Sequence, residues 1–195
     1  AGAILCAFML PADGPRSERV RVRIVDPIKV LRNRTLFVTS VGSAFYTGAL
    51  FTVIAWAPIA MGLRPIYAGL VFFGWGLLTA VAGVFVAPLL ARVVGEKAGV
   101  MVAISTYGLV MVLAGIGTFT GQIWLIGLAV ILSGFPSGVL NTLFTDVAMS
   151  AVGGDTPRSV SSAGFSFLRW MGAAIAAVLV AYLAKWTGSE ATPWW

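Results

Sequence analysis

The chain has 195 residues, of which 59% are apolar and 10% charged, and its formal net charge is +6. Together with a mean hydropathy of +0.96, these values exclude a disordered chain and an ordinary soluble domain. One cysteine, Cys6, and no histidine exclude an internal disulfide, histidine-ligated metal chemistry and Ser-His or Cys-His catalysis. We therefore expect no metal site, no cofactor and no enzymatic activity.

Four segments lack charged side chains almost entirely. Residues 35–63, 65–91 and 98–145 carry no Asp, Glu, Lys or Arg, and residues 159–184 carry only Arg169. A helix over 98–145 would be roughly twice the length that a ~30 Å hydrocarbon core requires, so this run predicts two crossings. The runs are too long for barrel strands. We predict an all-α, polytopic bundle with about five complete transmembrane helices and a partial one.

In chain order, residues 1–12 are apolar but too short to cross, so we expect the tail of a truncated transmembrane helix, with a signal-peptide core as the alternative. Residues 13–34 form a basic loop, in which Asp26 and Pro27 start a short surface helix that runs on into the first span. The bundle occupies residues 35–195. Gly117 and Gly121 are the expected breakers within the long uncharged run. The predicted spans are roughly 35–60, 66–91, 98–117, 123–150 and 158–185.

The basic residues predict the orientation. Seven of the 13 lie between Arg16 and Arg34, and the excess is local, so we expect a membrane protein that does not bind nucleic acid. With this loop inside, ten basic residues lie inside and two outside, as the positive-inside rule favours. We predict a multi-pass protein of the cell (inner) membrane. Its cytoplasmic loops are residues 13–34, 92–97 and 151–157.

Arg169 is the most informative polar residue. It lies about 15 Å into the fifth predicted span, where a lone guanidinium costs at least ~2.5–3.5 kcal/mol. Ser162 and Ser166 share its helix face by their spacing, and that face predicts the wall of a wet cavity. A structural arginine bonded to a neighbouring helix is an equally good interpretation.

The fourth span carries a matching polar stripe that includes Asn141, predicted at about the depth of Arg169. Upstream, the segment 134–138, with Pro136 between two glycines, predicts a kink near mid-membrane. Such kinks often line transporter pathways, although simple kinked packing explains the segment as well. Asp146 lies nearer the inner surface, where we favour a pair with Arg158 or Arg92 over a proton-carrying role.

In the first span, Thr39, Ser43, Tyr46 and Thr47 lie on one side, and Tyr46 is the candidate contact for an aromatic or amphipathic ligand. Scattered hydroxyls in membrane helices more often bond to the backbone. The predicted cavity-lining set is thus Arg169, Asn141, Tyr46, Ser162 and Ser166. The predicted inner-loop ion pairs involve Asp146, Arg158 and Arg92.

Several segments resemble the C-terminal half of a major facilitator superfamily transporter of the multidrug-efflux, drug:proton antiporter type. Residues 32–36 are similar to the basic entry of its seventh helix, 87–97 to a degenerate inner-loop motif, and 161–174, the most specific match, to its eleventh helix. The resemblance implies a fragment lacking the N-terminal half, with that half, a small-molecule substrate and the proton as partners in the lipid bilayer. It also implies that the first and fourth spans line a cavity, that the second and fifth flank the interface between the two bundles, and that the third faces lipid.

These observations predict a secondary active transporter that exports small amphipathic molecules or drugs by alternating access. A non-transporting membrane scaffold or assembly subunit is the alternative, because small residues recur at four-residue spacing. A membrane-embedded enzyme is the least favoured, because Asp146 is the only acid near a span.

Overall fold

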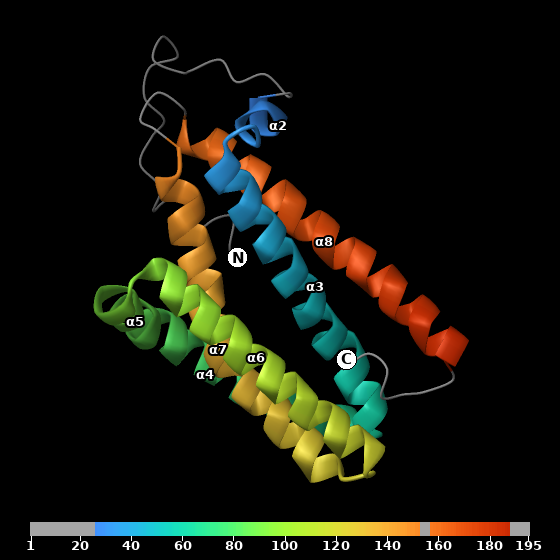
Figure 1. The fold of residues 1–195 in the computed structure, drawn as a ribbon. Coiled ribbons are helices and arrows are strands. Elements are labelled where there is room, and N and C mark those ends of the chain that lie inside the picture. The colour runs from blue at the N-terminus through green and yellow to red at the C-terminus, as the bar shows by residue number, and fades with distance from the viewer. Residues whose placement is uncertain (1–25, 153–156, 188–195) are drawn as a thin grey trace, which may run out of the picture.

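The computed structural model describes residues 26–152 and 157–187, apart from the side chains of 184 and 187, and this part consists of helices joined by short turns (Figure 1). The elements are α2 (Asp26–Val30), α3 (Arg34–Met61), α4 (Pro65–Val81), the π-helix η2 (Ala82–Val86), α5 (Ala87–Val94), α6 (Glu96–Phe119), α7 (Ile123–Ser150) and α8 (Arg158–Thr187). The segment α4–η2–α5 is continuous, and with α3, α6, α7 and α8 it gives five helices long and apolar enough to cross a membrane. The predicted fold class is confirmed. The predicted truncated tail, 1–12, and most of the basic loop lie outside the described residues.

The helix ends follow from local chemistry. The Asn33 side chain caps α3 by accepting from the N–H groups of Thr35 and Leu36 at 3.0 and 3.2 Å. Its amide also donates to the Ala151 carbonyl at 2.8 Å, which ties the start of α3 to the end of α7. Gly62 ends α3 with φ 56°, a left-handed conformation that glycine adopts without a steric cost.

Two local predictions were wrong. The short helix that starts at Asp26 does not run on into the first span, because it ends at Val30 and Asn33 begins a new helix. Gly117 is not a breaker either. It lies buried inside α6, where a Cβ would sit 3.0 Å from atoms of Ile126, and the reversal is made by Gly121 with φ 69°.

The helix α7 continues through Pro136, and the kink expected there stays a prediction, since a proline inside a continuous helix can bend it. A further irregularity lies in the second span, which the π-helix η2 interrupts. It faces α7, since Thr142 Oγ1 donates to the Gly83 carbonyl at 3.4 Å.

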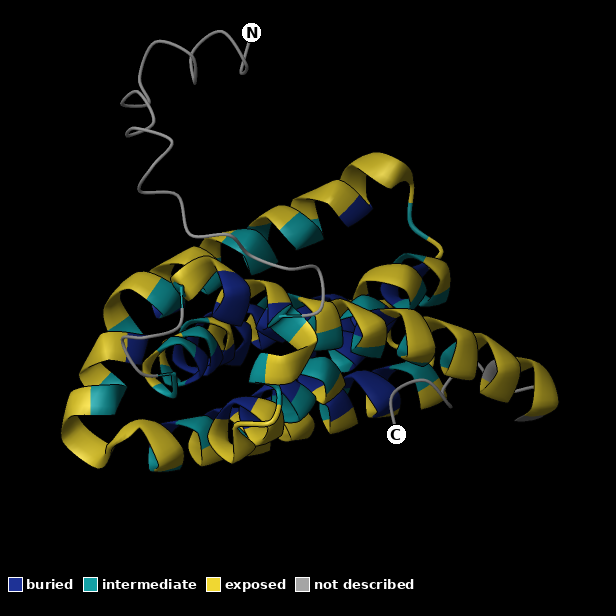
Figure 2. Ribbon diagram, turned by 90° about the horizontal axis from the view of Figure 1, so that it is seen from above, coloured by how far each residue is buried: buried dark blue, intermediate teal, exposed yellow. Residues whose placement is uncertain are grey.

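The helix α7 is the centre of the bundle. It is the most buried of the five long helices and packs against α3, α4 and α6. The helix α8 is the least buried and packs mainly along α3, beside which it runs in Figure 1. Figure 2 shows the buried residues in the middle of the bundle and exposed ones outside. Many exposed side chains are large and apolar, including Phe45, Phe73 and Phe119, as expected for a surface covered by lipid.

Glycines make close contacts in two of the helix pairs. On α7, Gly134 and Gly138 lie against the backbone of α4 at Trp75 and Thr79, which leaves no room for a Cβ. The α3–α8 contact has the same character, with Gly48 against Ala176 and Gly172 against Ala44. Small residues at helix contacts let membrane helices approach closely. These contacts fix the positions of the polar groups described next.

Candidate functional site

The pair α3–α7 divides the bundle into two sides. The α4 side is the one to which Gly134 and Gly138 of α7 point. The α6 side is the opposite one, where Phe45, Ala49 and Thr52 of α3 face α6 across an open cavity. Each predicted site residue can be assigned to one of these two sides by its contacts and its position on its helix.

Arg169 bridges two helices. Its Nε donates to the Thr47 hydroxyl at 3.1 Å, and so joins α8 to α3. Thr47 is 1% exposed and the arginine is half-buried. Both lie well inside their helices, about 16 Å from the start of α8 and about 20 Å from the start of α3. The structure therefore places a positive charge in the interior, held by a neutral hydroxyl.

This contact lies away from the α6 side. Thr47 follows Phe45 by two residues and so projects about 200° away from it around α3. Asn141 follows Gly134 by seven residues and Gly138 by three, which continues the stripe of α7 that faces α4. Asn141 is exposed. Arg169, Thr47 and Asn141 therefore belong to the α4 side.

The predicted serines differ in exposure. Ser162 is exposed and Ser166 half-buried, whereas Ser161 is 2% exposed and its hydroxyl has no hydrogen-bond partner. The predicted wall on α8 is thus open at Ser162 and partly covered at Ser166. The role of both in binding stays a prediction.

The Tyr46 side chain contacts α7 and α6. Its hydroxyl donates to the Ser137 carbonyl of α7 at 3.1 Å, and the side chain is 7% exposed. Its ring meets Tyr107 of α6 edge to face with centroids 5.7 Å apart. Tyr46 precedes Thr47, to which Arg169 is bonded, so the Tyr46 and Thr47 side chains start at similar depth. Tyr46 thus lies in the wall of the α6 side, bonded to the carbonyl one turn before Asn141.

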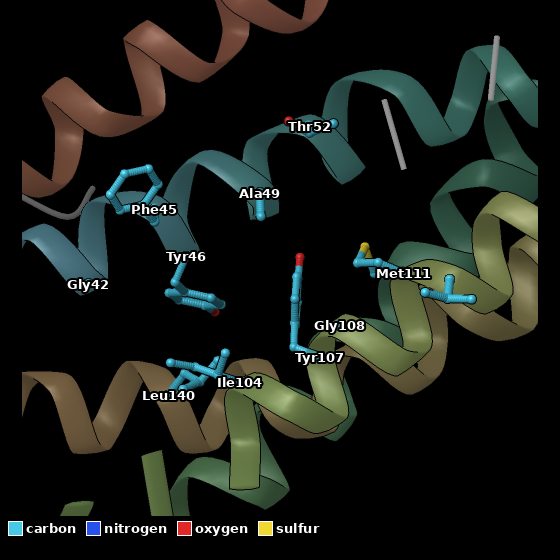
Figure 3. Close-up of a pocket in the computed structure, with 11 residues that line it drawn as sticks. Gly42, Phe45, Tyr46, Ala49, Thr52, Ile104, Tyr107, Gly108, Met111 and Leu140 are labelled. Atoms are coloured by element: carbon cyan, nitrogen blue, oxygen red, sulfur yellow. The ribbon is translucent and has the colours of Figure 1, made fainter. Parts of the chain in front are cut away.

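A cavity of about 620 Å³ opens between α3 and α6, with Tyr46 and Tyr107 in its wall (Figure 3). Tyr107 is 5% exposed, yet its hydroxyl has no hydrogen-bond partner and points toward α3. The sequence analysis missed Tyr107. Its only signal was a phenol in the middle of an uncharged run, where an unpaired hydroxyl is costly.

The predicted inner-loop ion pairs are absent here. Among the described residues, the ion pair present is Lys29 with Asp26 at 4.0 Å. Asp146, Arg92 and Arg158 are all exposed and do not pair with one another. In the same described ranges, no three His, Cys, Asp or Glu side chains form a metal-binding group.

The fold and these contacts define a class of protein: a multi-pass helical membrane protein with an interior cation and hydroxyl groups bonded between helices. The chain is similar to "Multidrug efflux protein YfmO" of Bacillus subtilis (strain 168), with 32% identity over 182 residues. The match covers 93% of this chain and 44% of that protein, so the chain spans less than half the length of the curated relative it matches. No protein-family model and no solved structure matches it.

Proposed function

We propose that the chain is part of a secondary active transporter of the major facilitator type that exports small amphipathic molecules or drugs. The observation that carries the proposal is the Arg169–Thr47 bond in the bundle interior. An intramembrane cation is expensive, so such residues usually mark a pathway or binding site. The name of the relative supports drug efflux as the activity.

The α4 side is the proposed wall of the pathway. Arg169 remains protonated at any physiological pH, so it acts by attraction and not by proton transfer. Its partner in the described part is neutral Thr47, and the guanidinium keeps further donors for a second group. We assign that second group to an acidic or hydrogen-bond-accepting partner, either on the substrate or on the N-terminal half of the transporter. Asn141 adds an amide on the same side.

Alternating access is the proposed mechanism, driven by an ion gradient with the proton as coupling ion. The glycine contacts of α4 with α7 and of α8 with α3 support this, because smooth helix surfaces can shift without unlocking large side chains. Asp146, Arg158 and Arg92 are the proposed ion pairs of another state of the cycle. They lie at the end that the charge distribution predicts to be cytoplasmic.

The test is drug efflux by the complete transporter in cells or inside-out vesicles. We expect gradient-dependent export of a fluorescent amphipathic dye and its loss when the gradient is collapsed. Export that persists without any ion gradient would reject secondary transport. No export of any amphipathic probe by a correctly inserted protein would favour the scaffold alternative.

A further inference from the structure

Two aromatic side chains lie beside the contact between Arg169 and Thr47. Phe51 of α3 and Trp170 of α8 meet edge to face, with ring centroids 5.6 Å apart. Phe51 follows Thr47 by four residues, so it lies one turn, about 6 Å, further along the same face of α3. Trp170 directly follows Arg169 on α8. The cation and the aromatic pair therefore share the α3–α8 boundary, about one turn apart.

Trp170 lies on the α4 side of this boundary. On the other side of α8, Leu168 and Leu179 line a lateral cavity together with Phe45 of α3. Trp170 projects about 160° away from Leu168 and about 180° away from Leu179 around the helix axis. The indole is therefore directed away from that cavity and lies on the side to which Arg169 belongs.

The depth and exposure of Trp170 are unusual for an indole. It is 57% exposed, and it lies 12 residues into α8, about 18 Å along the helix, which is near mid-membrane. Indole rings favour the membrane–water interfaces, where the N–H group finds a polar partner. An open indole beside an interior cation thus favours contact with a ligand that has both aromatic and polar groups over contact with acyl chains.

We propose that Arg169 and the Phe51–Trp170 pair form one subsite for a planar aromatic acid, whose ring packs against Trp170 and whose carboxylate accepts from the guanidinium. The subsite rests on the proposed export function and defines its substrate class. Thr47 occupies the Nε donor of Arg169. This leaves the two terminal nitrogens, and a guanidinium can bind a carboxylate with two parallel hydrogen bonds.

Charge favours an acid over a cationic drug at this position. Arg169 stays protonated, so an amine here would meet a like charge in a region where little water screens it. Among the described residues the acids are Asp26, Glu96 and Asp146, each at or within about 6 Å of a helix end. In the same part of the chain, the interior therefore offers a cation to a ligand carboxylate and no carboxylate to a ligand cation.

The first experiment needs no substitution. Equilibrium binding to the complete transporter in detergent is measured at pH 7, where a carboxylic acid is ionised, with radiolabelled 2-naphthoate and with its neutral analogue 2-naphthylmethanol. We expect 2-naphthoate to bind about tenfold more tightly or better, the usual gain from a hydrogen bond to a charged group. Equal affinities would overturn the proposal, and so would tighter binding of the cation 2-naphthylmethylammonium.

Substitutions then separate the charge from the ring. Arg169→Gln should weaken 2-naphthoate binding about tenfold or more and leave the affinity for 2-naphthylmethanol nearly unchanged. Trp170→Leu should weaken the binding of both probes several-fold, and Trp170→Phe, which keeps a ring, should restore most of it. The matched control is Trp186→Ala, which removes a 79% exposed indole of the same helix and should change neither affinity.

Two results with these variants would overturn the subsite. One is unchanged 2-naphthoate binding by Trp170→Leu. The other is a less stable Arg169→Gln protein with unchanged 2-naphthoate binding, which would place the second partner of the guanidinium on the N-terminal half.

Binding and export are measured separately, so the subsite and the proposed function can fail independently. Gradient-dependent dye export by a protein that does not bind 2-naphthoate would overturn the subsite and leave the export function standing. Binding with the expected dependence on charge and ring, in a protein that exports no dye, would support the subsite and reject export.

Discussion

Polar groups on the two sides of the α3–α7 pair differ in their hydrogen-bond partners and in their exposure. On the α4 side, Arg169 reaches Thr47 across a helix boundary, and Asn141 lies open beside the glycine stripe. On the α6 side, Tyr46 is bonded to backbone while Tyr107 has a buried hydroxyl without a partner. A charged group that is partly open suits a changing partner, whereas a buried neutral donor suits a permanent one. The contrast supports our proposal that the pathway lies on the α4 side.

The largest expected effect is that of Arg169→Ala on the α4 side. Loss of a hydrogen bond made by a charged group costs about 1.5–3 kcal/mol, so we expect export by the complete transporter to fall about tenfold or more while membrane insertion is unchanged. Dye efflux measured at equal protein level checks this.

Two variants sharpen the Arg169 experiment. Arg169→Lys keeps the charge but loses the Nε geometry and should retain part of the activity. Arg158→Ala removes an exposed arginine of the same helix and should matter much less. Normal export by Arg169→Ala would remove the α4 side as the pathway.

The sequence predicted the five long helices because uncharged runs of this length have one stable form in lipid. It also placed Arg169 in the interior and Tyr46 and Thr47 on a polar side of the first span. It did not separate these two neighbours, which point toward α7 and α8 respectively. Periodicity shows which residues are buried, and only the contacts show against which helix.

The irregular elements were harder to predict. The π-helix lies at 82–86 in the second span, directly ahead of Pro88 in the same continuous segment. Pro88 has no N–H for the carbonyl of Val84 and its ring crowds that carbonyl, which is a local cause of the irregularity that the sequence analysis missed. The fit to Gly138 and Thr142 of α7 adds a tertiary contact. The sequence analysis took Asn33 only as part of a basic motif. In the structure its side chain caps the start of α3.

The next effect concerns stability. Gly138→Ala in this chain should destabilise by about 1–3 kcal/mol, the usual cost of overpacking, because the new methyl group meets backbone atoms of Thr79 and Gly83, the latter at 2.8 Å. Reversible unfolding in detergent measures the change. Gly108→Ala is the matched control on the α6 side, where a Cβ meets nothing within 4 Å. Equal destabilisation by both would mean that α4 does not pack tightly on α7.

The smallest effect is expected for Tyr46→Phe, which removes the bond to the Ser137 carbonyl but keeps the ring contact with Tyr107. We expect a loss of about 0.6 kcal/mol in unfolding free energy and near-normal dye export. A loss of export comparable to that of Arg169→Ala would show that Tyr46, too, belongs to the pathway.

Water accessibility tests the division between the two sides most directly. Single cysteines at Asn141, Ser162 and Phe45, in the cysteine-free complete transporter, are treated with a membrane-impermeant maleimide applied to each membrane face. The account predicts that positions 141 and 162 react and are protected by a transported dye, while position 45 does not react. Unreactive 141 and 162, or a position 45 that reacts and is protected by the dye, would contradict it.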